Sequence, residues 1–160
     1  MRIHVDADGC PVKPEVYRVA LRYGLSVFVV ANSGMETPND PRVESVRVGS
    51  GADAADDCIV AHLEATDIVV TTDVPLAARC VAKQAAVLHP TGRRWTEDDI
   101  GSALAMRDLL TRLRSEGERT RGPAPFQDRD RSAFLQALDA TIQKGLRSRP
   151  RDPASPSGPA

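Results

Sequence analysis

The chain has 160 residues, a formal net charge of −1 and three cysteines. This length is typical of one domain that buries roughly two-thirds of its unfolded surface, so folding requires neither disulfides nor a structural metal. The near balance of charge argues against a broad polyanion-binding surface, and no apolar run approaches the roughly 20 residues of a membrane span. We expect a cytoplasmic bacterial protein with reduced thiols and no membrane partner.

The chain begins with an alternation of short apolar runs and helical patterns. Residues 2–7, "RIHVDA", predict a strand that an Asp-Gly pair ends. Pro14 and Gly24 suit the start and the end of a helix. The continuous apolar run at 26–31 predicts a strand that is covered on both faces.

The same alternation continues along the chain. The pattern predicts an edge strand at 42–48, a helix at 53–65, a buried strand at 67–72, a helix at 73–83 and a last strand at 85–89. This order is typical of a mainly parallel sheet between helical layers, so we predict an α/β three-layer sandwich.

Two further helices are predicted at 96–117 and about 128–146. We therefore predict a single domain at 1–148, with a core at 1–92 and a C-terminal helical extension at 96–148. The tail at 149–160 is rich in Pro, Ser and Gly and is predicted to be disordered.

Carboxylates follow two of the predicted buried strands. Asp6 and Asp8 end the first strand, and Asp73 follows the strand at 67–72. Ligands of parallel sheets bind at the carboxyl ends of the strands, so we expect these acids to meet there. A turn needs one acid where this chain has two, which favours a functional role for Asp6 and Asp8. Asp73 also suits the N-cap of the next helix.

Further acids lie on the helix between these strands. Asp53, Asp57 and Glu64 fall within about 40 degrees of arc on that helix. Clustered oxygen ligands without Cys or His suit Mg²⁺ or Mn²⁺, which could orient a water and stabilise charge on a phosphodiester. A structural alternative stays open for Asp53 and Asp56, because capping and the helix dipole explain both.

Other residue types give weaker signals. Cys10, Cys58 and Cys80 have no zinc-site spacing and are expected to be packed thiols. Basic residues of the second half could line a phosphate-binding approach, although helix surfaces carry such residues routinely. Asn32 and Arg107 are our predicted substrate-binding residues, with Arg107 on phosphate.

Several separated blocks of the sequence carry a family resemblance. They are HVDADGCPV, VAN, VRVGSGADAADDCIVAHLEATDIVVTTDVPLA, HPTGRRWT, AMRDLLTRLR and GPAPFQDRDRSAF. Together, from about residue 2 to residue 140, they resemble the bacterial YaiI/YqxD family of uncharacterised proteins.

That family is similar to the PIN-like superfamily, whose members are commonly Mg²⁺- or Mn²⁺-dependent ribonucleases with an acidic cluster at the strand ends. The resemblance implies a PIN-like fold, RNA as the substrate and a cation as the cofactor. The catalytic residues that it implies are Asp6, Asp8, Asp57 and Asp73. Asp53 would join them as a metal ligand or supporting acid.

Two alternative functions stay open. "VDADG" also resembles the first motif of haloacid-dehalogenase-type phosphohydrolases, in which Asp6 would be the nucleophile and Asp8 a general acid/base. Lys83 and Asp73 do not match the later motifs of those enzymes. The other alternative is a non-catalytic module that binds RNA or a protein through its C-terminal half.

Overall fold

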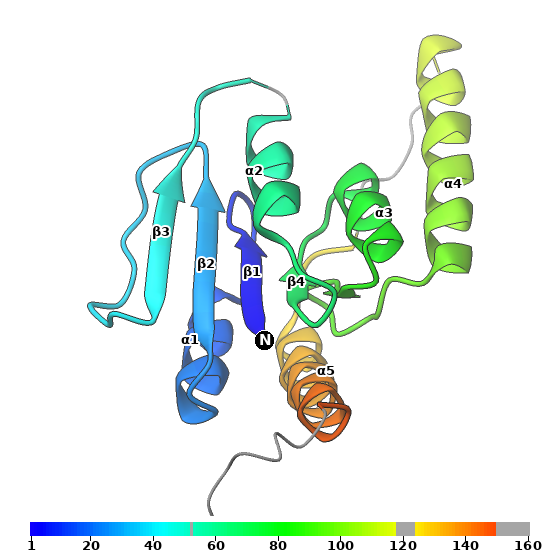
Figure 1. Ribbon diagram of the computed structural model, residues 1–160. Helices are drawn as coiled ribbons and strands as arrows, with labels where there is room; N and C mark the ends of the chain where they lie inside the picture. Colours follow the sequence, from blue (N-terminus) through cyan, green and yellow to red (C-terminus); the bar gives the residue numbers. More distant parts are fainter. Residues whose placement is uncertain (52, 118–123, 150–160) are drawn as a thin grey trace, which may run out of the picture.

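A five-stranded sheet lies at the centre of the fold (Figure 1). The structure is a computed structural model, and it describes residues 1–51, 53–117 and 124–149. In chain order the strands are β1 (Arg2–Asp6), β2 (Ser26–Ala31), β3 (Val43–Arg47), β4 (Ile68–Val70) and β5 (Ala86–Leu88). The order across the sheet is β3-β2-β1-β4-β5, and each of these neighbours pairs in parallel. β3 lies at an edge, as its alternating sequence predicted.

Helices cover both faces of this sheet. They are α1 (Lys13–Arg22), α2 (Ala54–His62), α3 (Val74–Ala82), α4 (Glu97–Ser115) and α5 (Asp128–Arg147). α1 and α5 pack on one face, while α2, α3 and the start of α4 pack on the other. The predicted α/β sandwich with a mainly parallel sheet is therefore confirmed.

The apolar runs form strands because both of their faces are covered. In β2, Val29 enters the core under α1 and α5, whereas Phe28 and Val30 enter the core under α2 and α3. Burial on both sides removes the polar alternation that a half-exposed strand would show. Cys10 and Cys80 are buried thiols, as predicted, whereas Cys58 is only partly buried.

The two C-terminal helices pack very differently. α5 places Phe134, Leu138 and Ile142 in the core beside α1, where each has 0% of its surface exposed. α5 is thus an integral part of one helical layer. α4 starts with a capping box between Thr96 and Asp99, contacts α3, and then extends away from the sheet (Figure 1).

A tight loop joins β5 to α4 and lies against α5. Gly92 sits in this loop at a φ of +89°, and a Cβ at this position would lie 2.6 Å from the carbonyl carbon of Ala133. Only a glycine avoids both the unfavourable φ and the collision. The loop is therefore fixed by close backbone packing.

The predicted disordered tail lies outside the described residues apart from Arg149. Within the described ranges, no helix is long and apolar enough to cross a membrane.

Candidate functional site

Acidic side chains from separate segments line one cavity at the carboxyl ends of the strands. The cavity has a volume of about 440 Å³. Its lining residues are Asp6, Asp8, Asn32, Ala55, Asp56, Thr72, Asp73, Val74 and Arg107. We call it the acidic pocket. In the sheet, β1 lies between β2, which follows it in the chain, and β4, which comes later. The strand order therefore reverses at β1, and open parallel sheets bind ligands beyond the carboxyl ends of the strands at such a position.

A buried threonine joins the ends of the two central strands. Val5 of β1 pairs with Val70 of β4, so the next residues of the two segments, Asp6 and Thr71, lie side by side. The Thr71 hydroxyl donates to Asp6 Oδ2 at 2.9 Å, and its oxygen accepts a hydrogen bond from the Asp73 backbone N–H at 3.0 Å. Thr71 thus fixes the Asp6 carboxylate relative to the Asp73 backbone.

The environment of Asp6 disfavours its charge. Burial raises the pKa of Asp6, and the negative charges of Asp73 and Asp8 act in the same direction. The hydrogen bond from Thr71 opposes the rise without cancelling it. Asp6 is therefore a carboxylate whose ionised form gains from a nearby positive charge.

Asp73 combines the two roles that its sequence position suggests. It is the N-cap of α3, and its Oδ1 accepts a hydrogen bond from the Leu76 N–H at 2.9 Å. The same residue lines the acidic pocket. Capping fixes the orientation of the carboxylate, and Oδ2 has no hydrogen-bond partner among the described residues.

Asp8 lies in the turn after β1, and its side chain links this turn to the end of β2 by a hydrogen bond. Its Oδ2 accepts a hydrogen bond from the Asn32 backbone N–H at 2.7 Å. Asn32 directly follows β2 and lines the pocket. The predicted residues Asp6, Asp8, Asp73, Asn32 and Arg107 are therefore brought together in one cavity.

α2 contributes a carboxylate that the sequence prediction did not place in the site. Asp56, in the first turn of α2, lines the pocket. Burial, followed by the charges of Asp73, Asp6 and Asp53, raises the pKa of Asp56 to about 6, while Arg79 partly opposes the rise. The charge of Asp56 is coupled to those of the two strand-end acids.

The structure does not place Asp57 or Asp53 among the residues that line the pocket. Asp57 forms an ion pair with Arg79 at 2.8 Å, and 65% of its side-chain surface is exposed. Asp53 occupies the N-cap position of α2 without a side-chain hydrogen bond to the helix, so the alternative capping role is not formed either. Its charge still reaches Asp56.

The reason lies in which side of α2 faces the sheet. Ala55 and Ile59 are its buried residues, and Asp56 lies next to them at the start of the helix. Of the acids that the spacing picks out, Asp53 and Asp57 are exposed, and Glu64 is exposed beyond the end of α2, which stops at His62 and not at the predicted residue 65. The apolar positions of the helix were the signal that could have identified Asp56 instead of Asp57.

The charge balance of the pocket is strongly negative. Arg107 of α4 is the only cationic side chain that lines it among the described residues. In that part of the chain, no group of three or more Asp, Glu, His or Cys side chains is already arranged as a metal site. The acids share a cavity without closing around a single point.

The whole chain is similar to a set of bacterial proteins. The model of a family described as "Uncharacterized BCR, YaiI/YqxD family" matches residues 4–144. A UPF0178 protein of Rhodopseudomonas palustris (strain HaA2) is 57% identical over 97% of this chain and 94% of its own length. A UPF0178 protein of Nitrobacter winogradskyi is 54% identical over 90% of this chain and 92% of its own length. No solved structure matches the chain.

Proposed function

The chain belongs to the YaiI/YqxD family, and for this member we propose a Mg²⁺- or Mn²⁺-dependent hydrolase that cleaves RNA phosphodiester bonds at the acidic pocket. One observation carries the proposal: four carboxylates from three segments of the chain converge beside one arginine at the carboxyl ends of β1 and β4. They are Asp6, Asp8, Asp56 and Asp73, and the arginine is Arg107.

The chemistry of these side chains fits a hard divalent cation. Carboxylate oxygens are the ligands that Mg²⁺ and Mn²⁺ prefer, and the pocket offers them without a competing Cys or His. Burial and then repulsion from neighbouring acids raise the pKa of Asp56 to about 6, and a bound cation would relieve the repulsion. Mg²⁺ usually keeps several of its waters, so direct ligation by one or two of the acids is sufficient.

In this proposal Asp6 and Asp73 hold the cation and Asp8 and Asp56 bind its waters. Asp53 supports them through its charge, and Asp57 remains outside on the surface. The cation supplies stabilisation of the charge that develops on the phosphodiester and orientation of the attacking water.

Arg107 and Asn32 have a different task in the proposal. Arg107 offers the planar, fixed charge that suits a phosphate oxygen, and it lines the acidic pocket from α4. Asn32 offers an amide that both donates and accepts hydrogen bonds. The choice of RNA rests on the resemblance to PIN-like ribonucleases.

One contact weighs against the phosphohydrolase alternative. Lys83 donates from Nζ to the Val60 carbonyl at 2.8 Å, and it does not line the acidic pocket. A nucleophilic role for Asp6 would lack the lysine that such enzymes use. The non-catalytic alternative would bind RNA or a protein through the C-terminal half of the chain and would not cleave RNA.

The test is RNA cleavage by the purified protein with Mg²⁺, with Mn²⁺ and with EDTA. We expect cleavage with either cation, its loss in EDTA, and a loss of at least 100-fold in Asp73→Asn. Asp57→Asn is the matched control, because it removes an equal charge from the surface beside the pocket and should retain activity. Cleavage that persists in EDTA or in Asp73→Asn would contradict the proposal, and RNA binding without cleavage would support the non-catalytic module.

A further inference from the structure

A second cavity lies at the amino ends of the strands, opposite the acidic pocket. Its volume is about 250 Å³, and its lining includes Ile68 and Ala86, the first residues of β4 and β5. The acidic pocket lies at the other ends of the strands. The five residues of β1 separate these two edges by roughly 16 Å at about 3.3 Å per residue. One small molecule therefore cannot occupy both cavities.

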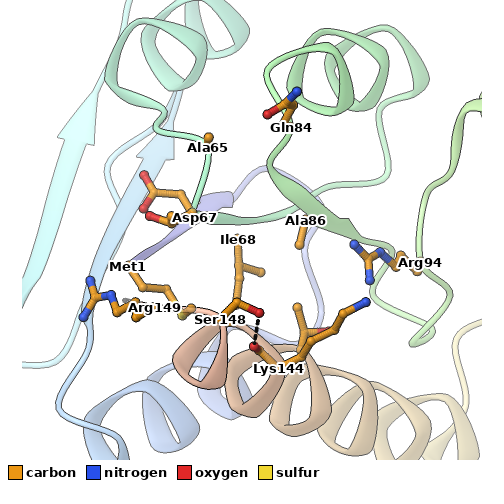
Figure 2. Close-up of a pocket in the computed structure, with 13 residues that line it drawn as sticks. Met1, Ala65, Asp67, Ile68, Gln84, Ala86, Arg94, Lys144, Ser148 and Arg149 are labelled. Atoms are coloured by element: carbon orange, nitrogen blue, oxygen red, sulfur yellow. Dashed lines mark hydrogen bonds between the residues drawn. The ribbon is translucent and has the colours of Figure 1, made fainter. Parts of the chain in front are cut away.

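Three cationic side chains surround this cavity, which we call the basic pocket. Arg94 comes from the loop after β5, and Lys144 and Arg149 come from the end of α5 and the residues after it. Figure 2 shows the side chains of Arg94 and Lys144 extending toward one another on one side, with Arg149 on the other. The structure gives none of the three an ion pair with a carboxylate of the described residues.

The single acid that lines the basic pocket is already satisfied. Asp67 accepts hydrogen bonds from the backbone N–H of Arg2 at 2.9 Å and of Glu64 at 3.1 Å, and it pairs with His4 Nε2 at 2.9 Å. Burial acts to raise the pKa of Asp67, but the hydrogen bonds from these three residues outweigh it and hold the pKa below its ordinary value. Its charge is therefore used inside the protein rather than against the cations of the pocket.

Like charges that converge on one cavity without an acidic partner are an unfavourable arrangement that an anion would relieve. Arginine and lysine together bind phosphate groups through charge-assisted hydrogen bonds. The cavity also has an apolar part, formed by Ala65, Ile68 and Ala86. That part offers contact to an uncharged organic group, as ligand pockets commonly do.

We propose that the basic pocket binds a small phosphate monoester, with the phosphate between Arg94 and Lys144 and the organic group on the apolar part beside Ile68 and Ala86. This site is separate from the acidic pocket and does not depend on its proposed function. The volume of about 250 Å³ lies slightly below the roughly 300–1,000 Å³ that is common for ligand sites, which favours a small molecule no larger than a mononucleotide.

The test is isothermal titration calorimetry in EDTA, which removes divalent cations from the acidic pocket. The probes are AMP, inorganic phosphate and adenosine. We expect AMP to bind the wild-type protein more tightly than inorganic phosphate does, because only AMP also contacts the apolar part. Adenosine should not bind. Equal affinities of AMP and phosphate would overturn the monoester assignment in favour of free phosphate, and no binding of AMP would overturn the site.

Two double variants locate the binding. Arg94→Gln/Lys144→Gln should weaken AMP binding at least tenfold. Arg129→Gln/Arg147→Gln removes the same charge from exposed positions of α5 outside the pocket and should bind as the wild type does. Equal loss in both variants would show a general charge effect and contradict the proposal.

A third variant separates the two cavities. Asp6→Asn should leave AMP affinity unchanged, because Asp6 lies at the opposite edge of the sheet. Loss of AMP binding in Asp6→Asn would place the phosphate in the acidic pocket and overturn the proposal. Circular dichroism of each variant confirms that the fold is retained.

Discussion

Asp56→Asn should stabilise the metal-free protein at pH 7, although it removes a residue of the proposed site. A carboxyl group that titrates near 6 instead of 3.8 disfavours folding by at most about 3 kcal/mol at pH 7, at about 1.4 kcal/mol per pH unit. Asp56 is partly exposed, and screening by solvent reduces this figure to about 1 kcal/mol. For a chain of this size the melting temperature should rise by about 3 °C.

The sign of the pH dependence follows from proton binding. Between pH 4 and pH 6 the folded state holds a proton on Asp56 more often than the unfolded state does, because the folded pKa is the higher one. Stability therefore falls as the pH rises through this interval. Asp56→Asn abolishes this fall, so its advantage over the wild type should be present at pH 7 and largely absent at pH 4.

Urea unfolding in EDTA at both pH values measures this difference. Asp57→Asn is the control, because it removes a neighbouring charge and a surface ion pair with Arg79 that contributes about 0–1 kcal/mol. It should be neutral or slightly destabilising at pH 7. The reasoning is refuted if Asp56→Asn is no more stable than the wild type at pH 7, or if its gain is the same at pH 4.

Three further substitutions test the packing of the fold and the hydrogen bonding of the site. Gly92→Ala should lower the free energy of unfolding by about 2 kcal/mol or more, because the new Cβ collides with the α5 backbone. Gly117→Ala, also at positive φ but in open space, should lower it by about 1 kcal/mol. Urea unfolding midpoints compare the two variants. Phe134→Ala should lower the free energy of unfolding by about 3–5 kcal/mol in the same assay. A loss below about 1 kcal/mol would contradict the packing of α5 in the core. Thr71→Val should raise the pKa of Asp6 further, because it removes the hydrogen bond that favours the ionised carboxylate. NMR titration of the Asp6 carboxyl group measures this change. An unchanged pKa would show that the hydrogen bond does not affect the ionisation of Asp6.

The fold was largely predictable because local patterns determine its parts. Continuous apolar runs predicted the strands that are covered on both faces, such as β2 and β4. A capping residue and first-turn acids predicted α4. The alternation of strands and helices then restricted the topology to a mainly parallel sheet.

The site was predictable where it depends on strand ends and less so where it depends on helix rotation. Asp6 and Asp73 meet because they follow neighbouring parallel strands. The choice between Asp56 and Asp57 depends on which side of α2 faces the sheet. The stripe of acids alone suggested the exposed side, and the buried positions of Ala55 and Ile59 decide otherwise.

Long-range packing lay beyond the sequence patterns. The apolar face of α5 was visible, but its partner α1 lies more than 100 residues earlier in the chain. The basic pocket likewise combines Asp67, Arg94 and Lys144, which no local spacing connects. Such sites come from tertiary contacts between segments that each read as an ordinary helix or loop.

Calorimetry of Mn²⁺ binding to the wild-type protein and to Asp6→Asn/Asp73→Asn tests the proposed cation site, with circular dichroism to show that both proteins are folded. We expect the wild type to bind Mn²⁺ and the double variant to lose that binding, because in our proposal the two carboxylates at the ends of β1 and β4 hold the cation. Equal Mn²⁺ affinity in the two proteins, or no binding to the wild type, would contradict a divalent-cation site in the acidic pocket.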